Sequence, residues 1–585
     1  MELQGLRVKR AALLLALALA LPAALGTVPA GARAATTTTA VDPNAPALVT
    51  AQDTPPRGYR LTAAQVLAIA SRNPAVRREL RRHPAATPYQ YTKGPGRWQV
   101  SWFAAGRPER ELMQVYVDDA SGRVTEVWTG FQVAWTMARG YPGAFGRVVN
   151  AWYVWVPLCI AFVAPFLPRR RRLSLLHLDL LVLLGFSISL ALFNHAKIGL
   201  SVPLVYPCLI YLLVRMLLLA FGRGRPRRPL SPLVPTPWLV VGIVFLVGFR
   251  VGLNVTDSNV IDVGYAGVIG ADKLLHGSDL YGNWPRDNAS GDTYGPVNYY
   301  AYVPFRAIFG WSGSWDDLPA AHAAAIAFDL LTLLALFALG RRIRGPTLGV
   351  ALAYAWAAYP FTLWTLSSNT NDSLVALLVT LTLLVLGAAP ARGVGAALAG
   401  LSKLAPLALG PLFIRGAGER PGRRSAVLYL LAYAVTIAVA MLPVLLDHNL
   451  HAFWRDSIAY QSSRVTPFSV WGLWGGLGFE QHLLEGAAVA LALAVAVIPR
   501  RRTVVEVSAL AAAVVIALQI CGNYWLYSYI VWFFPLVIVA LFAAHPSTLG
   551  WAIAVAEDER VERLPLVPAG AAGPRWSDRS APGSQ

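Results

Sequence analysis

Long apolar runs alternate with short basic segments along most of the chain. By hydropathy and charge we count about eleven runs of the roughly 18 or more residues that a bilayer core requires. They lie near residues 148–167, 178–195, 200–221, 237–255, 320–340, 347–366, 373–389, 426–446, 483–498, 504–522 and 527–544. This pattern predicts an all-α polytopic membrane protein.

Arginine clusters fall in the segments that join these runs, for example at 169–172 and 500–502. Basic residues in short loops mark the cytoplasmic side of a membrane. If the N-terminal region is extracytoplasmic, the count of spans puts every arginine cluster on the cytoplasmic side. We therefore expect a multi-pass plasma-membrane protein with external segments at 256–319 and 447–482 and a cytoplasmic C-terminus.

One apolar segment, 393–414, breaks the alternation, because Arg392 precedes it and Arg415 follows it. Lys403 and Pro406 interrupt it near its centre. We expect two short half-helices that meet at Lys403, since broken helices are tolerated where they are buried in protein or line a cavity. A single span with a misassigned flank is the alternative.

The two ends of the chain have compositions that favour processing or disorder. Basic residues, an apolar run at 11–25 and an A-x-A pattern are typical of a secretory signal peptide, so we expect residues 1–34 to be a signal peptide or an uncleaved anchor. Residues 35–57, rich in Thr, Ala and Pro, are predicted to be a disordered linker. Residues 545–585 are predicted to be a cytoplasmic, mostly disordered tail.

A small extracytoplasmic α+β domain is predicted between the linker and the first span. Residues 61–70 have helical apolar spacing, with Thr62 as the expected N-cap. Segments that alternate as strands do lie at 98–102, 113–117 and 124–128. This stretch resembles a PepSY-type domain, whose limits we place at 58–140. The resemblance implies a binding or regulatory role.

The composition agrees with a membrane protein. The chain is 56% hydrophobic and 14% charged, with a mean hydropathy of +0.49, whereas soluble domains carry about a quarter charged residues. The net charge of +19 comes with arginines placed between spans rather than in a basic stripe with aromatics, which argues against nucleic-acid binding. The cysteines, Cys159, Cys208 and Cys521, lie in or beside apolar runs, so neither a disulfide framework nor a zinc site is expected.

The segment after the run at 237–255 carries the most informative motifs. An acidic residue just beyond a span precedes an amphipathic helix, and "LLHGSDLY" and then "YGPVNYY" follow. Its candidate residues are Asp257, Asp262, His276, Tyr281 and Tyr294. This arrangement resembles the first external loop of GT-C glycosyltransferases, and most of all the polyprenyl-phosphomannose-dependent group, glycosyltransferase family 87. The resemblance covers roughly residues 237–544.

The resemblance implies inverting transfer of a sugar, mannose in that group, from a polyprenyl-phosphate donor to an extracytoplasmic glycolipid or polysaccharide. Such a transfer needs a base for the acceptor hydroxyl, and a carboxylate can contribute about 10²–10⁴-fold. By the family's spacing the base is Asp262, with Asp257 second; either residue could instead cap the helix that begins near Val263. We expect no cofactor and no metal, because the acid-rich loop lacks EF-hand spacing.

The departing phosphate needs a cation or aligned N–H donors. Lys403 is the first candidate, because a lysine in an apolar stretch is costly, and "GLSKLAPL" resembles a Lys-containing segment of the family. Lys403 could instead pair with an acidic residue or snorkel. Arg464 is a second candidate and Arg250 a third, although snorkelling is the simpler interpretation for Arg250. Asn371 and Asp372, in an external turn, could touch the sugar or cap the next helix.

The alternative function is a transporter or lipid flippase with a regulatory external domain. Transporters often carry internal repeats with paired broken helices, whereas this sequence has one broken segment and no evident repeat, which favours the enzyme. The N-terminal domain and three additional spans at 148–221 depart from the simpler family pattern, which begins near residue 237. These additions could dock an acceptor or a protein partner.

Overall fold

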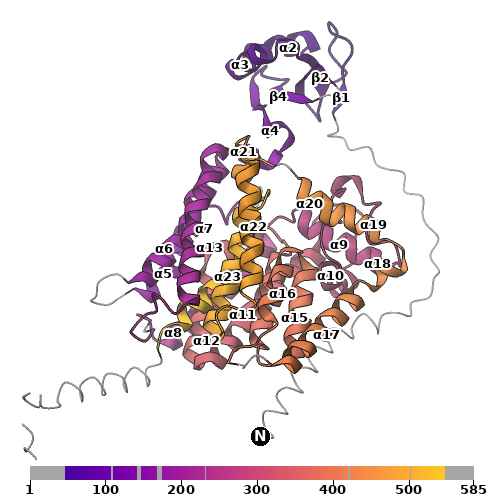
Figure 1. Ribbon diagram of the computed structural model, residues 1–585. Coiled ribbons are helices and arrows are strands. Elements are labelled where there is room, and N and C mark those ends of the chain that lie inside the picture. Colours follow the sequence, from indigo (N-terminus) through magenta and orange to yellow (C-terminus); the bar gives the residue numbers. More distant parts are fainter. Residues whose placement is uncertain are drawn as a thin grey trace, which may run out of the picture.

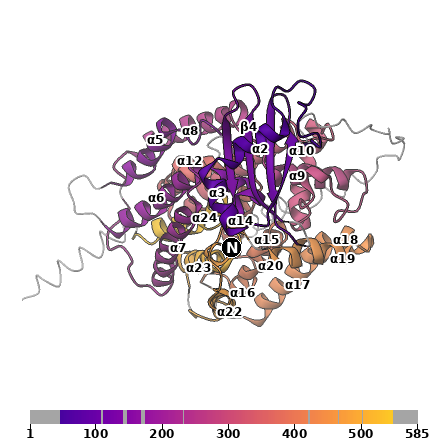
Figure 2. The ribbon, with the colours of Figure 1, turned by 90° about the horizontal axis from the view of Figure 1, so that it is seen from above.

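A computed structural model of the chain describes residues 46–106, 110–140, 146–167, 174–230, 232–418, 422–464, 466–500 and 502–546. The predicted signal peptide and nearly all of the predicted C-terminal tail lie outside these residues. Figure 1 shows a small N-terminal domain standing on one end of a bundle of helices. Seen from above, this domain lies over the part of the bundle that contains α14 and α15 (Figure 2).

The N-terminal domain is an antiparallel sheet with helices packed against it. In the described residues the sheet has five strands in the order β1-β2-β3-β4-β5. Its strands are β1 (Ala47–Leu48), β2 (Thr87–Thr92), β3 (Arg97–Phe103), β4 (Glu111–Asp118) and β5 (Val124–Thr129). The helices are α2 (Ala63–Ser71) and α3 (Pro74–Arg82), followed by the short α4 (Phe131–Ala134) and η1 (Thr136–Arg139). The predicted helix and the three predicted strands are confirmed as elements.

Local side chains explain these elements. Thr62 caps α2 as predicted, because its hydroxyl accepts a hydrogen bond from the Gln65 N–H. Trp98, Val100 and Trp102 alternate along β3 and are buried in the core beneath α2. The sheet starts earlier than predicted, since Ala47 and Leu48 pair with β2 although the sequence placed them in the linker. Backbone hydrogen bonds make this pairing, so the pattern of side chains in the sequence did not predict it.

The rest of the described chain is a helical membrane protein. Among the described residues, six helices are long and apolar enough to cross a membrane: α6 (Leu175–Asn194), α7 (Ile198–Ala220), α8 (Thr236–Thr256), α11 (Pro319–Arg344), α17 (Arg423–Ala440) and α23 (Val504–Cys521). Shorter apolar helical stretches are Trp152–Phe166, which contains α5 (Trp152–Val163), α12 (Pro346–Ala358), α14 (Asp372–Leu384) and Tyr527–Ala543, which contains α24 (Ile530–Ala543). The count of about eleven spans stays a prediction.

Shorter helices lie within or directly beside the two hydrophilic segments, 256–319 and 447–482. They are α9 (Asp262–Leu275), α10 (Pro296–Phe309), α18 (Leu442–Leu446), α19 (Leu450–Phe453), α20 (Tyr460–Ser463), α21 (Val470–Leu473) and α22 (Gly478–Ala494). In Figure 1, α9, α19 and α20 are seen at the right of the bundle, below the N-terminal domain.

The run predicted as one span at 347–366 is two helices, α12 and α13 (Pro360–Ser367). Proline has no N–H to continue the helical ladder, and its ring pushes the preceding residue out of helical conformation. Tyr359 accordingly has an extended ψ of 124°.

The segment around Lys403 is broken as predicted. It consists of α15 (Ala389–Ser402), η4 (Ala405–Leu409) and α16 (Gly410–Phe413), and Lys403 itself is extended, with φ −138° and ψ 138°. The guanidinium of Arg392, near the start of α15, donates to the carbonyl oxygens of Phe413 and Ile414. The two ends of the segment therefore lie together, and the chain folds back on itself.

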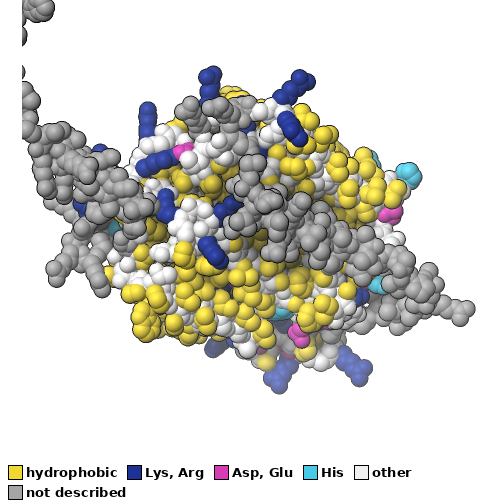
Figure 3. All heavy atoms as spheres, turned by 90° about the horizontal axis from the view of Figure 1, so that it is seen from below, with side chains coloured by type: hydrophobic (Ala, Val, Ile, Leu, Met, Phe, Trp, Pro, Cys, Tyr) yellow, Lys and Arg dark blue, Asp and Glu magenta, His cyan; other side chains and the backbone are white. Residues whose placement is uncertain are grey.

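The face opposite the N-terminal domain is apolar with projecting basic side chains. Figure 3 shows Lys and Arg side chains distributed over this face and few Asp or Glu side chains. This is the distribution that the positive-inside bias produces on a cytoplasmic surface.

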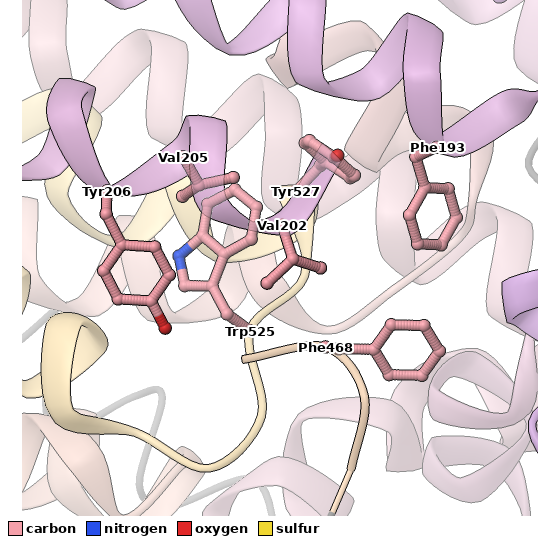
Figure 4. Close-up of a pocket in the computed structure, with 7 residues that line it drawn as sticks. All are labelled: Phe193, Val202, Val205, Tyr206, Phe468, Trp525 and Tyr527. Atoms are coloured by element: carbon pink, nitrogen blue, oxygen red, sulfur yellow. The ribbon is translucent and has the colours of Figure 1, made fainter. Parts of the chain in front are cut away.

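A small apolar space lies between α6 and α7 on one side and residues 468 and 525–527 on the other. It is lined by Phe193, Val202, Val205, Tyr206, Phe468, Trp525 and Tyr527, whose side chains surround it in Figure 4. Its volume of about 10 Å³ is close to the minimum that one water molecule needs. It is a packing gap, and no substrate fits in it.

Candidate active site

Asp262 opens α9, and close packing holds this end of the helix in place. A Cβ added at Gly264 would lie 2.2 Å from the carbonyl oxygen of Asn369, so the first turn of α9 rests directly on the turn before α14. The side-chain amide of Asn288 donates to the Asp262 carbonyl oxygen at 2.9 Å. The predicted helix after Asp262 is thus confirmed, and its first turn is anchored to two other segments.

The carboxylate of Asp262 combines solvent exposure with strong electrostatic influence from the protein. Its side chain is exposed to solvent. Desolvation by the surrounding protein is the largest effect and raises the pKa of the carboxyl above its ordinary value. The N–H of Val263 and the positive charges of Arg464 and Lys403 lower the pKa in part. The acid and the two cations therefore share one electrostatic environment.

Lys403 is buried and paired. Its ammonium lies 2.5 Å from the Asp372 carboxylate. It also lies 5.3 Å from the ring centroids of Tyr294 and Tyr529 and 5.0 Å from that of Trp532. The indole N–H of Trp532 donates to the same carboxylate oxygen at 2.7 Å. Lys403 is therefore paired with an acidic residue, which was one of the two alternatives to a free cation.

The break after α15 brings Lys403 to the loop that precedes α10. A Cβ added at Gly295 would lie 2.0 Å from the carbonyl oxygen of Leu401, so this loop touches the last turn of α15. The buried Tyr281 donates its hydroxyl to the carbonyl oxygen of Tyr294 at 2.9 Å. Tyr281 therefore supports the backbone of Tyr294, whose ring faces the lysine.

Arg464, just after α20, is held by aromatic rings. Its guanidinium lies 4.3 Å from the ring centroid of Tyr524, 5.2 Å from that of Trp135 and 5.6 Å from that of Tyr460. Its Nε has no hydrogen-bond partner, and no carboxylate in the described part of the chain forms an ion pair with it. A cation whose charge is not balanced by an acid is suited to an anionic ligand.

Five residues from separate elements thus form what we call the central cluster. Its members are Asp262, Tyr294, Asp372, Lys403 and Arg464. They come from the start of α9, the loop before α10, the start of α14, the break after α15 and the end of α20.

Residues 293–528 match the model of glycosyltransferase family 87. The match contains four members of the central cluster and begins after Asp262. It covers less than half of the chain, and it indicates a membrane glycosyltransferase of GT-C type in this part of it. No curated protein matches the chain. The N-terminal domain lies outside the match, so its PepSY-like character stays a prediction.

Two of the predicted site residues serve packing in the structure. Arg250 is fully buried, forms an ion pair with Asp329 and donates to the hydroxyl of Thr362 at 3.0 Å, so it does not snorkel. Asp257 accepts a hydrogen bond from the Val148 N–H at 2.8 Å, which ties the segment before α5 to the end of α8. Neither residue has a described contact with the central cluster.

The remaining predicted residues lie around the cluster at different depths. His276 is exposed, and its Nδ1 lies 3.3 Å from the carboxylate of Asp272. Asn371 is buried, and its side-chain amide donates to the oxygen of the Asn298 side chain at 2.7 Å. In the described residues no group of three or more His, Cys, Asp or Glu side chains is placed to hold a metal ion, and independence from metal stays a prediction.

One contact of the site has no signal in the sequence. Trp135 comes from the end of the N-terminal domain, and nothing in the neighbouring sequence links it to the segment that bears Arg464. Tyr524 and Trp532 lie in an aromatic-rich segment beside an apolar run, and aromatic residues are common at membrane interfaces. In the structure both rings instead face cations of the cluster.

Proposed function

We propose that the chain transfers a sugar from a polyprenyl-phosphate donor to an extracytoplasmic glycolipid or polysaccharide acceptor, with inversion at the anomeric carbon. Mannose is the sugar that we propose first. The observation that carries this proposal is the central cluster, in which a solvent-exposed carboxylate shares its environment with two cations inside or beside the family 87 match.

Asp262 is the proposed base. As the acceptor oxygen bonds to the anomeric carbon, the carboxylate takes the proton of the acceptor hydroxyl, and the bond from that carbon to the phosphate oxygen breaks. Polyprenyl phosphate leaves with the electron pair, and the proton later passes to water. A raised pKa suits this task, because a base works best when its pKa lies nearer the working pH.

Arg464 is the proposed first contact of the departing phosphate. Its guanidinium offers several N–H donors, and aromatic rings rather than acids surround it. Charge that develops on a phosphate is stabilised most by donors that are already in place. Lys403 is the second contact, since its pairing with Asp372 offsets part of its charge.

Aromatic rings of the cluster are the proposed surroundings of the sugar and the first prenyl units. The rings of Tyr294, Tyr529 and Trp532 face Lys403, and that of Tyr524 covers Arg464. Rings of this kind offer large apolar faces beside polar edges. We propose Tyr294 as the ring nearest to the transferred sugar, because Asp262 also influences its hydroxyl electrostatically.

The proposed orientation puts the N-terminal domain and the cluster on the extracytoplasmic side. The basic face in Figure 3 lies opposite the N-terminal domain, which agrees with that orientation. Polyprenyl-phosphate sugars displayed in the outer leaflet would then meet the cluster from the membrane.

The direct test is sugar transfer by the purified full-length protein in lipid nanodiscs. Radiolabelled synthetic polyprenyl phosphate-mannose is the donor and octyl α-mannoside the acceptor. Asp262→Asn removes the base, so we expect turnover to fall by about 10²–10⁴-fold. Asp257→Asn is the matched control and should keep turnover near wild type, since an amide oxygen can still accept from the Val148 N–H.

Turnover retained in Asp262→Asn would contradict the assignment of the base. Movement of polyprenyl phosphate-mannose across proteoliposomes of the wild type, with no transfer to the acceptor, would instead favour the flippase alternative.

A further inference from the structure

A cleft lies between the N-terminal domain and the helical bundle. Its volume is about 690 Å³, within the roughly 300–1,000 Å³ typical of small-molecule sites. One wall comes from the start of β4 and from α4, and the other from residues 466–472, which include part of α21. Figure 1 shows α4 projecting from the sheet toward α21.

The walls of the cleft combine aromatic faces with charged groups. Phe131 is 38% exposed, and Trp135 is half-buried. Arg110 and Glu111 stand at the same cleft, and Thr466 and Pro467 line its other side. A saccharide presents apolar C–H faces that stack on aromatic rings and hydroxyls that both donate and accept hydrogen bonds. The lining therefore offers both kinds of contact that a sugar chain needs.

Trp135 links the cleft to the central cluster. This ring lines the cleft and also lies 5.2 Å from the guanidinium of Arg464. It meets Phe468 edge to face, with ring centroids 5.7 Å apart. Arg464 in turn lowers the pKa of Asp262. A ligand in the cleft is thus separated from the cation of the cluster by a single ring.

We infer that this cleft binds the non-reacting part of a saccharide acceptor, with Phe131 and Trp135 as stacking surfaces. The inference rests on the proposed function and assigns the N-terminal domain to acceptor recognition. Binding energy from sugar units in the cleft then holds the terminal hydroxyl near Asp262. An acceptor too short to reach the cleft gains none of that energy.

Phe131→Ala tests the inference, because its side chain is partly exposed and has no contact with the central cluster. Acceptor kinetics are compared for octyl α-mannoside and for an α-manno-oligosaccharide of several units. We expect the KM of the oligosaccharide to rise about tenfold, as loss of one stacking contact worth about 1.4 kcal/mol predicts. The KM of octyl α-mannoside and both kcat values should stay unchanged. Phe309→Ala is the matched control, since Phe309 is 50% exposed and lies outside the cleft.

Direct binding keeps this inference separable from the proposed reaction. Saturation-transfer NMR of the same oligosaccharide with the full-length protein in nanodiscs needs no donor. The wild type could bind the oligosaccharide without any transfer activity, and Phe131→Ala could weaken that binding. This result would contradict the proposed reaction and support saccharide binding in the cleft. Equal KM values in Phe131→Ala and wild type for both acceptors, or no oligosaccharide binding to the wild type, would overturn the inference. If the cleft instead docks a protein partner, the wild type will not bind the oligosaccharide.

Discussion

The two cations of the central cluster differ in how their charges are balanced. Lys403 shares its charge with the buried carboxylate of Asp372, whereas Arg464 is surrounded by rings. Removing one partner of a buried pair typically costs about 3–5 kcal/mol, because the other charge is left uncompensated. Lys403 therefore stabilises the fold of the site whatever it binds. Arg464 is the cation whose charge is open to a ligand, and its effects can be measured on the base.

Activity is expected to rise with pH through the pKa of Asp262, because only the deprotonated carboxylate accepts a proton. Desolvation raises this pKa, so the rise should lie above the value of about 3.9 that is usual for aspartate. Arg464→Gln removes a positive charge that favours the carboxylate form, which raises the pKa further. We expect the rise in kcat/KM to move to higher pH, with a higher KM for the donor.

Arg455→Gln is the control for this profile. Arg455 lies in the same segment of the chain, 447–482, is 60% exposed and pairs with its own neighbour Asp456. An unshifted profile in Arg464→Gln, or the same shift in both variants, would show that the charge of Arg464 does not act on the base.

The site is built from the ends of helices rather than from their faces. Asp262 and Asp372 lie in the first turns of α9 and α14, and Lys403 follows the last turn of α15. Helix ends leave backbone groups unpaired and allow the chain to turn sharply toward a neighbour. The positions of these side chains consequently depend on how closely the loops between helices pack.

Gly295→Ala tests the packing between the loop before α10 and the end of α15. The added Cβ would overlap the carbonyl oxygen of Leu401 at 2.0 Å, so one of the two backbones must move. That movement shifts Tyr294 relative to Lys403, and a displacement of about 1 Å can cost about 10²-fold in rate. We expect kcat/KM to fall by about that factor.

Gly252→Ala is the matched substitution, because a Cβ at this position in α8 meets no atom within 4 Å. Its rate should equal that of the wild type, and its midpoint of thermal unfolding should not fall, since alanine is more favourable than glycine inside a helix. If Gly295→Ala also matched the wild type in kcat/KM, close packing of this loop would not matter for the chemistry.

Across the whole molecule, the segment after α20 joins three parts of the chain. Phe468 contacts Trp135 of the N-terminal region, Phe193 of α6 and Tyr524 beside the cluster. The backbone N–H of Val470 donates to the hydroxyl of Tyr206 in α7. The N-terminal domain and the additional helices are therefore packed on the segment that carries Arg464.

The proposed orientation predicts which surfaces a membrane-impermeant thiol reagent reaches. Ser121 is exposed in the turn after β4, and Arg341 is exposed near the end of α11. In intact cells we expect labelling of Ser121→Cys, and labelling of Arg341→Cys only after the membrane is permeabilised. The same protein with its natural cysteines alone serves as the background. Labelling of Arg341→Cys in intact cells, with Ser121→Cys protected, would reverse the orientation.

The sequence alone determined that most of the chain is apolar helix, which part is a small sheet and where the segment 393–414 breaks. These features depend on neighbouring residues: apolar runs, alternation along strands, and the interruption at Lys403 and Pro406. It also singled out Lys403, because a charged side chain within an apolar run stands out locally. Asp262 and Arg464 were candidates through the resemblance to glycosyltransferase family 87.

Only the tertiary structure decided what those charges meet. The pairing of Lys403 with Asp372, the aromatic surroundings of Arg464 and the burial of Arg250 against Asp329 all join segments far apart in the chain. Contacts of that kind depend on how helices pack against one another, and the hydrophobic pattern of one segment does not specify its partner. For the same reason the contact between Trp135 and Arg464 could not be predicted, because it depends on how the N-terminal domain packs on the bundle.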